Sequence, residues 1–254
     1  MKVLALDTSS PYTSCALCEV RLGEPAQVLA ESLFEPPQKA GDLLPAALAA
    51  LCAQAGLGSG LQEVQGLAVG IGPGSFTGLR VGLAAMKTLA YALRLPLAGV
   101  SSLAALALSA RVEPSRLIAP TLEARRGELY ASLLRGAEIL WPEAVYQAAA
   151  FADRVRTLDQ PGDPGPPLIV GPGARANAAL LGDLALGLSA PNAQTGPRGP
   201  LAWAIAQLCA SQLEGADYDA ARCFALAPNY LQESRAEVAL REGRVGGLRG
   251  AKLA

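Results

Sequence analysis

The chain has 254 residues, of which 51% are hydrophobic and 17% charged, and none is histidine. The missing histidine excludes a Ser-His-Asp or Cys-His nucleophile pair and a histidine-bound zinc ion as sites that this chain makes alone. The 21 basic and 22 acidic residues give a net charge of −1, which provides no overall positive field for nucleic acid or an anionic membrane.

The first predicted strand, residues 3–7, is a continuous apolar run that ends at Asp7. Such a run is typical of a strand that is buried on both faces. An acid this early does not fit the core of a signal peptide, and no stretch approaches the ~20 apolar residues that span a bilayer. We therefore expect a cytoplasmic protein without membrane contact.

Two further strands are predicted at residues 13–20 and 26–34, and the turn between them contains glycine and proline. Cys15 and Cys18 lie in the first of these strands with the spacing of a CxxC motif. No second cysteine pair and no histidine accompany them, so we favour reduced cysteines packed in the core over a metal or redox site.

The next elements alternate between helix and strand. We predict a helix over 42–55, a strand over 66–69, a helix over 76–94 and a strand over 97–100. The resulting order βββαβαβ predicts a mixed sheet of the ribonuclease-H-like kind, in which hairpins are followed by helical crossovers.

A second, weaker βββα pattern begins near residue 116, and two similar halves indicate a duplicated α/β fold with two mixed sheets. Its predicted elements are strands at 117–122, 128–134, near 139 and at 168–170, and helices at 148–156, 174–181 and 201–213. We place the first lobe at 1–108, the second, smaller lobe at 109–218 and a C-terminal segment at 219–254. This last segment is expected to be mobile after about residue 235.

A glycine-rich loop, residues 70–80 (GIGPGSFTGLR), joins a predicted strand to a predicted helix. It lacks the Lys-Ser/Thr pair of a Walker A loop and the third glycine of a dinucleotide-binding fingerprint. Two interpretations stay open. One is a generic anion site in which Ser75, Thr77 and Arg80 take part; the other, which we favour, is a tight turn with a helix cap.

The two helices of the first half are apolar around most of their circumference, which is expected when more than one side is buried. This pattern fits either a helical interface with another subunit or helices sandwiched inside the monomer. For the first case the predicted contact residues are Leu44, Leu48, Leu51, Leu79, Leu83, Met86 and Ala90.

Five stretches together resemble the TsaB (YeaZ) family, in register from residue 1 to about 232. They are LALDTS, GPGSFTGLR, GVSSL, ARRGELY and PNYL, at residues 4–9, 72–80, 99–103, 124–130 and 228–231. The resemblance implies two actin-like ATPase (ASKHA) lobes. It also implies a non-catalytic scaffold or dimerization subunit in the formation of N6-threonylcarbamoyladenosine in tRNA.

The resemblance also implies partners for this chain. TsaD is expected as the catalytic partner and TsaE as a further subunit, and the chain is expected to form a homodimer when TsaD is absent. ATP and metal are expected on the partner subunits, none on this chain alone, and tRNA is expected to bind through the assembled complex. The sequence departs from the family pattern at three positions. This chain has Lys39 or a neighbour where the family usually has a histidine. It has Glu123 where the family has an aspartate, and Gln232 where an arginine is common.

The competing hypothesis is an ATP-binding phosphotransferase or ATPase of the same fold. Sugar kinases and actin-like ATPases keep an acidic residue where this chain has Asp7, although a turn cap is the safer interpretation of that residue. The corresponding vestigial nucleotide or anion site comprises Asp7, Ser75, Thr77, Arg80, Gly171 and Gly173, and no metal ligands are predicted. A peptidase is disfavoured because the chain lacks histidine, and a direct tRNA contact through the basic tail is a further hypothesis.

Overall fold

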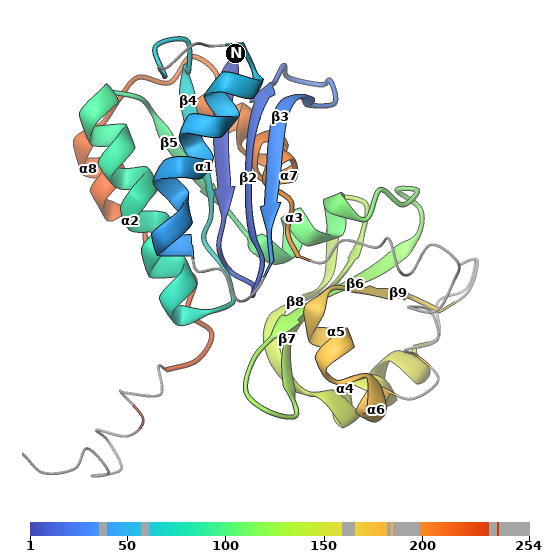
Figure 1. Ribbon diagram of the computed structural model, residues 1–254. Coiled ribbons are helices and arrows are strands. Elements are labelled where there is room, and N and C mark those ends of the chain that lie inside the picture. The colour runs from blue at the N-terminus through green and yellow to red at the C-terminus, as the bar shows by residue number, and fades with distance from the viewer. Residues whose placement is uncertain are drawn as a thin grey trace, which may run out of the picture.

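The computed structural model describes residues 1–35, 40–56, 61–158, 166–181, 184, 199–233 and 238, with the backbone alone at 40–43. These residues form two lobes, each built around one sheet (Figure 1). Two predictions concern residues outside the described ranges. One is the replacement of a family histidine near Lys39, and the other is the mobility of the tail after about residue 235, of which only residue 238 is described. In the described part of the chain, no helix is long and apolar enough to cross a membrane.

The first lobe contains a five-stranded sheet in the order β3-β2-β1-β4-β5. β1 pairs with β2 in antiparallel and with β4 in parallel orientation, so the sheet is mixed as predicted. All five predicted strands are confirmed to within one residue: β1 (Lys2–Asp7), β2 (Thr13–Glu19), β3 (Gln27–Phe34), β4 (Gly66–Gly70) and β5 (Leu97–Val100).

Three helices cover the two faces of this sheet. α1 (Ala40–Gln54) and α2 (Phe76–Leu93) contact each other and pack on one face, and α7 (Ala202–Leu213) packs on the other. α8 (Ala220–Ala225) lies against α2 and was not predicted, because six residues are too few to show a helical period.

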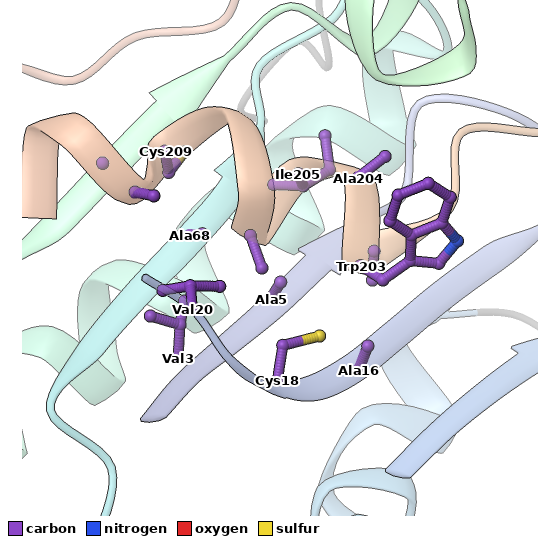
Figure 2. Close-up of a cluster of buried hydrophobic side chains, with 14 of the residues drawn as sticks. Val3, Ala5, Ala16, Cys18, Val20, Ala68, Trp203, Ala204, Ile205 and Cys209 are labelled. Atoms are coloured by element: carbon purple, nitrogen blue, oxygen red, sulfur yellow. The ribbon is translucent and has the colours of Figure 1, made fainter. Parts of the chain in front are cut away.

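The position of α7 corrects the predicted boundary of the second lobe. The sequence placed residues 109–218 in that lobe, but α7 packs against β1 and β4 of the first sheet. Figure 2 shows α7 above the small side chains of Ala5, Ala16 and Ala68, which lie on β1, β2 and β4. Its first amide, on Ala202, donates a hydrogen bond of 2.8 Å to Oγ of Ser14 on β2. The last helix of the predicted second lobe therefore completes the first.

The second lobe contains a four-stranded sheet in the order β8-β7-β6-β9, again with antiparallel and parallel pairs. Helices of the lobe cover one face, and α3, which follows β5 and was not predicted, covers the other. The elements are α3 (Ser102–Ser109), β6 (Leu117–Glu123), β7 (Glu128–Arg135), β8 (Glu138–Gln147), α4 (Ala148–Arg156), β9 (Leu168–Val170), α5 (Pro172–Ala176) and α6 (Ala178–Leu181). The α/β class with two mixed sheets is thus confirmed.

Two elements of this lobe differ from the prediction. β8 is ten residues long rather than a short run near residue 139, because it pairs with the whole of β7. The helix predicted over 174–181 is divided into α5 and α6 at Asn177, whose side-chain amide donates hydrogen bonds to the carbonyl oxygens of Gly173 and Glu128. A side chain that bonds to nearby backbone groups competes with a continuous helix.

Candidate functional site

The glycine-rich loop packs directly on the turn that follows β1. A Cβ atom at Gly74 would overlap the carbonyl oxygen of Ser9, and one at Gly78 would overlap that of Thr8. Gly82, one turn further along α2, is equally close to the Thr8 side chain. The Ser75 amide donates a hydrogen bond of 2.6 Å to the Ser9 carbonyl. These glycines therefore allow two backbone segments to approach each other closely.

Two residues of the predicted anion site, Ser75 and Arg80, are engaged within the chain. Ser75 is the N-cap of α2, and its Oγ accepts a hydrogen bond of 3.2 Å from the Gly78 amide. The Arg80 guanidinium lies 3.9 Å above the Phe76 ring, and its Nε donates to the Tyr230 hydroxyl at 3.1 Å. The loop geometry is thus that of a capped tight turn.

Gly78→Ala tests this packing function. Alanine is the better helix former by about 1 kcal/mol, so helix propensity alone would stabilise the variant. The overlap with the Thr8 carbonyl should outweigh this gain and lower the free energy of unfolding by about 2 kcal/mol. Urea unfolding measures the difference, with Ala84→Ser on the exposed face of the same helix as control. A Gly78→Ala variant more stable than the parent chain would contradict the packing account.

Asp7 lies at the end of β1 and is fully buried. One carboxylate oxygen accepts hydrogen bonds from the amide and hydroxyl of Ser9, at 2.9 and 2.7 Å, and the other accepts from the Ser102 hydroxyl at 2.6 Å. Burial raises the pKa of Asp7 above its ordinary 3.8, although these hydrogen bonds act in the opposite direction. The carboxylate is the centre of a buried hydrogen-bonded turn that joins β1 to α3.

The raised pKa of Asp7 predicts a pH dependence of stability. A group that binds its proton more tightly in the folded state stabilises the fold at low pH. That contribution is lost as pH rises from the ordinary value of 3.8 through the folded-state pKa. Because asparagine does not titrate, the stability of the parent chain relative to Asp7→Asn should fall as pH rises above 4. Urea unfolding of both proteins above pH 4 measures this change in relative stability. A parent chain that gains stability relative to Asp7→Asn as pH rises would contradict the assignment.

A pocket with a volume of about 560 Å³ lies between the two lobes. It is lined by the turn after β1, the start of α2, the β6–β7 turn and residues that follow α8. The lining residues are Ser9, Ser10, Pro11, Gly74, Ser75, Phe76, Thr77, Glu123, Ala124, Arg125, Tyr130, Asn229, Tyr230, Leu231, Gln232 and Glu233. Of the six residues predicted for a vestigial site, Ser75 and Thr77 reach this pocket, whereas Asp7, Arg80, Gly171 and Gly173 are not among its walls.

Gly171 and Gly173 instead pack on the backbone of β6. Gly171 has a φ of 103°, in the region that favours glycine, and a Cβ there would overlap the carbonyl oxygen of Thr121. A Cβ on Gly173 would be 2.6 Å from the carbonyl oxygen of Leu122. The second glycine turn is therefore also a close-packing device. Across the described ranges, no three Asp, Glu or Cys side chains gather as a metal site would require.

The predicted contact residues on α1 and α2 are largely buried inside the first lobe. Leu83 is 6% exposed, Met86 is fully buried, and both pack with Leu4, Leu6 and Val69 of the sheet. Leu44, Leu51, Leu79 and Ala90 are likewise buried, and only Leu48 is half-buried. In this structure the six buried side chains belong to the core of the monomer, and only Leu48 is partly accessible to a partner.

The opposite sides of α1 and α2 carry a different surface, which we call the α1–α2 outer face. On α1 it consists of Pro45, Ala46, Ala49, Ala50 and Ala53, and on α2 of Thr77, Val81, Ala84, Thr88 and Ala92, all exposed or half-buried. None of these residues is charged, and most are small. The cations of α2 are engaged elsewhere: Lys87 Nζ donates to the Phe224 carbonyl at 2.8 Å, and Arg80 stacks on Phe76.

Comparison with known proteins places the chain in a family. The family model described as "TsaD: tRNA N6-adenosine threonylcarbamoyltransferase" matches residues 39–168. The "tRNA threonylcarbamoyladenosine biosynthesis protein TsaB" of Bacillus subtilis is 32% identical over 179 residues, which is 69% of this chain and 73% of that protein. The chain belongs to the TsaB family. The Escherichia coli TsaB is also 32% identical, over 62% of this chain and 68% of that protein.

A solved structure agrees with the TsaB assignment. "YeaZ from Pseudomonas aeruginosa" superimposes with a TM-score of 0.63 and 25% identity, covering 91% of this chain and 99% of that one. The fold is therefore the two-lobed, actin-like fold of the TsaB family, as the resemblance implied. Of the two departures from the family pattern that lie in described residues, Glu123 lines the inter-lobe pocket and Gln232 bonds to the second lobe.

Proposed function

We propose that this TsaB-family chain acts in tRNA threonylcarbamoyladenosine biosynthesis as a non-catalytic partner subunit that binds and supports a TsaD-type transferase. Its relatives from B. subtilis and E. coli are named as proteins of that biosynthesis. The match to the transferase family model supports a common fold for this chain and the proposed partner. The observation that carries the proposal is the α1–α2 outer face.

This face has the properties of a helical docking surface. Alanine, threonine and proline side chains are short, so the helices of a partner can approach α1 and α2 closely and form a four-helix arrangement. Removing charged groups from water is the main penalty when polar surface is buried. The outer face carries no charged residue, so a partner that covers it would not incur this penalty there. We propose that a TsaD-type subunit covers the face in the complex and that a second copy of this chain covers it otherwise.

Several features support a role without catalysis by this chain. Asp7 is sealed beneath the turn after β1, and the Ser75 amide is bonded to the Ser9 carbonyl, so neither is available to a phosphate group. We therefore assign ATP and metal to the partner subunits, among them a TsaE-type ATPase, and tRNA to the assembled complex.

Size-exclusion chromatography with light scattering tests the proposal. The purified chain is mixed with the TsaD-type transferase of the same organism and passed through the column. A 1:1 complex is the expected result, together with a tRNA threonylcarbamoylation rate that depends on this chain. Separate elution at micromolar concentrations would contradict it.

The ATP-binding alternative has one observation in its favour, the inter-lobe pocket beside Ser9, Ser75 and Thr77. Titration calorimetry of the isolated chain with Mg-ATP separates the two functions. We expect no heat of binding, and submicromolar affinity would favour the phosphotransferase or ATPase.

A further inference from the structure

A segment that follows α8 runs from one lobe to the other. We call residues 226–233 the strap. Its first part packs on the first lobe, where Leu226 lies against Ile71 and Gly99. Its last part contributes Leu231 to the hydrophobic cluster between α3 and the second sheet. Five strap residues, Asn229 to Glu233, also form one wall of the inter-lobe pocket.

Asn229 bonds to both lobes at once. Its backbone amide donates a hydrogen bond of 2.7 Å to the Ile71 carbonyl in the first lobe. Its side-chain amide donates 2.9 Å to one carboxylate oxygen of Glu143 on β8 of the second lobe. The other oxygen of Glu143 accepts from the hydroxyl of Ser101, the N-cap of α3. Glu143 therefore joins β8, the start of α3 and the strap in one network.

The end of the strap is held by the second lobe through a further set of polar contacts. Gln232 donates a hydrogen bond of 2.7 Å to the Glu128 carboxylate and accepts one of 3.2 Å from the Tyr130 hydroxyl. Arg125 donates at 3.1 Å to the carbonyl of Glu233. On the first lobe, the Tyr230 ring stacks on Phe76 with 4.8 Å between ring centroids.

We propose that the strap is a clamp that holds the two lobes at one fixed angle across the inter-lobe pocket. Interfaces between domains of one chain are usually small and polar, so relative motion is the default unless additional contacts oppose it. Here Asn229 bonds to both lobes, Tyr230 stacks on the first lobe and Gln232 bonds to the second. Any change of the angle would break the bonds of Asn229 or Gln232. A partner bound to the first lobe would then meet the second lobe in a constant orientation.

Pulsed electron spin resonance on the full chain tests the clamp. Spin labels at Glu24→Cys, in the turn before β3, and Ala150→Cys, on α4, report the distance between the lobes from exposed positions. All five native cysteines are buried, so labelling is confined to the two new ones. Dilution with unlabelled protein removes distances between copies. We expect a single narrow distance distribution in the parent chain.

Asn229→Ala with Gln232→Ala should replace this narrow distribution by a broad one. If the double variant fails to fold, Gln232→Glu takes its place. This variant keeps the size of the side chain but places a carboxylate against Glu128, and it should broaden the distribution in the same way. The matched control is Gln147→Ala, which removes a bond to the same Glu128 carboxylate from within the second lobe and should leave the distribution narrow. A broad distribution in the parent chain, an unchanged one in the strap variants, or equal broadening in the control would each overturn the proposal.

Discussion

Leu83→Glu should unfold the first lobe rather than detach a partner from a folded chain. The Leu83 side chain is 6% exposed and packs in the cluster between α2 and the sheet. A carboxylate at this position has no cation among the hydrophobic residues of that cluster, and burial of an unpaired charge is among the most destabilising changes known. We expect a loss on the order of 4–5 kcal/mol in the free energy of unfolding.

Circular dichroism and urea unfolding of the isolated variant measure this loss. The matched control is Leu93→Glu, the same change on the same helix at a side chain that is 39% exposed. The control should lose less than ~1 kcal/mol. A Leu83→Glu chain that remains as stable as the control would show that the buried stripe of α2 is not part of the core.

Ala84→Glu should have the opposite phenotype, a stable chain that no longer binds its partner. Ala84 is exposed at the centre of the α1–α2 outer face, so the carboxylate remains hydrated in the monomer and changes its stability by about 0.5 kcal/mol or less. In the proposed complex the same charge would be buried without a cation. We expect affinity for the TsaD-type subunit to fall about 100-fold or more.

Affinity can be measured by titration calorimetry or by concentration-dependent light scattering. Ala150→Glu on α4 introduces the same residue at another exposed alanine, far along the chain in the second lobe, and should bind as the parent does. Equal binding by Ala84→Glu and Ala150→Glu would place the partner on another surface.

The strands of the first lobe could be predicted from the sequence because their signal is local. β1 and β4 are continuous apolar runs between polar turns, and the structure buries every residue of β4. α3 escaped detection because it follows β5 after one residue, so its apolar pattern merges with that of the strand. The location of α7 depends on its fit to Ala5, Ala16 and Ala68, which are distant in sequence, and no local pattern encodes it.

The proposed contact surface was harder to predict for a physical reason. Both α1 and α2 are apolar on two sides, and the larger side chains, such as Leu83 and Met86, lie in the core because their burial removes more apolar area from water. The exposed side, where we propose that a partner binds, carries alanine and threonine, such as Ala84 and Thr88. These residues contribute little to a hydrophobic pattern. Their signal is the lack of charge along a whole exposed helix face.

Only one wall of the inter-lobe pocket could be predicted from the sequence. Ser75 and Thr77 could be placed near it from the glycine-rich loop. The other wall is made by Asn229 and Gln232, which follow α8 and reach the pocket only through the fold of the complete chain. The PNYL stretch at residues 228–231 was visible in the sequence, but only long-range hydrogen bonds give it a structural role.

We propose that the α1–α2 outer face is the surface that binds a TsaD-type transferase. Size-exclusion chromatography with light scattering, applied to equimolar mixtures of the transferase with the parent chain, Ala84→Glu or Ala150→Glu, tests it most directly. We expect a 1:1 complex with the parent and with Ala150→Glu, and separate elution of a folded Ala84→Glu chain. Co-elution of Ala84→Glu with the transferase at the parent's stoichiometry would contradict it.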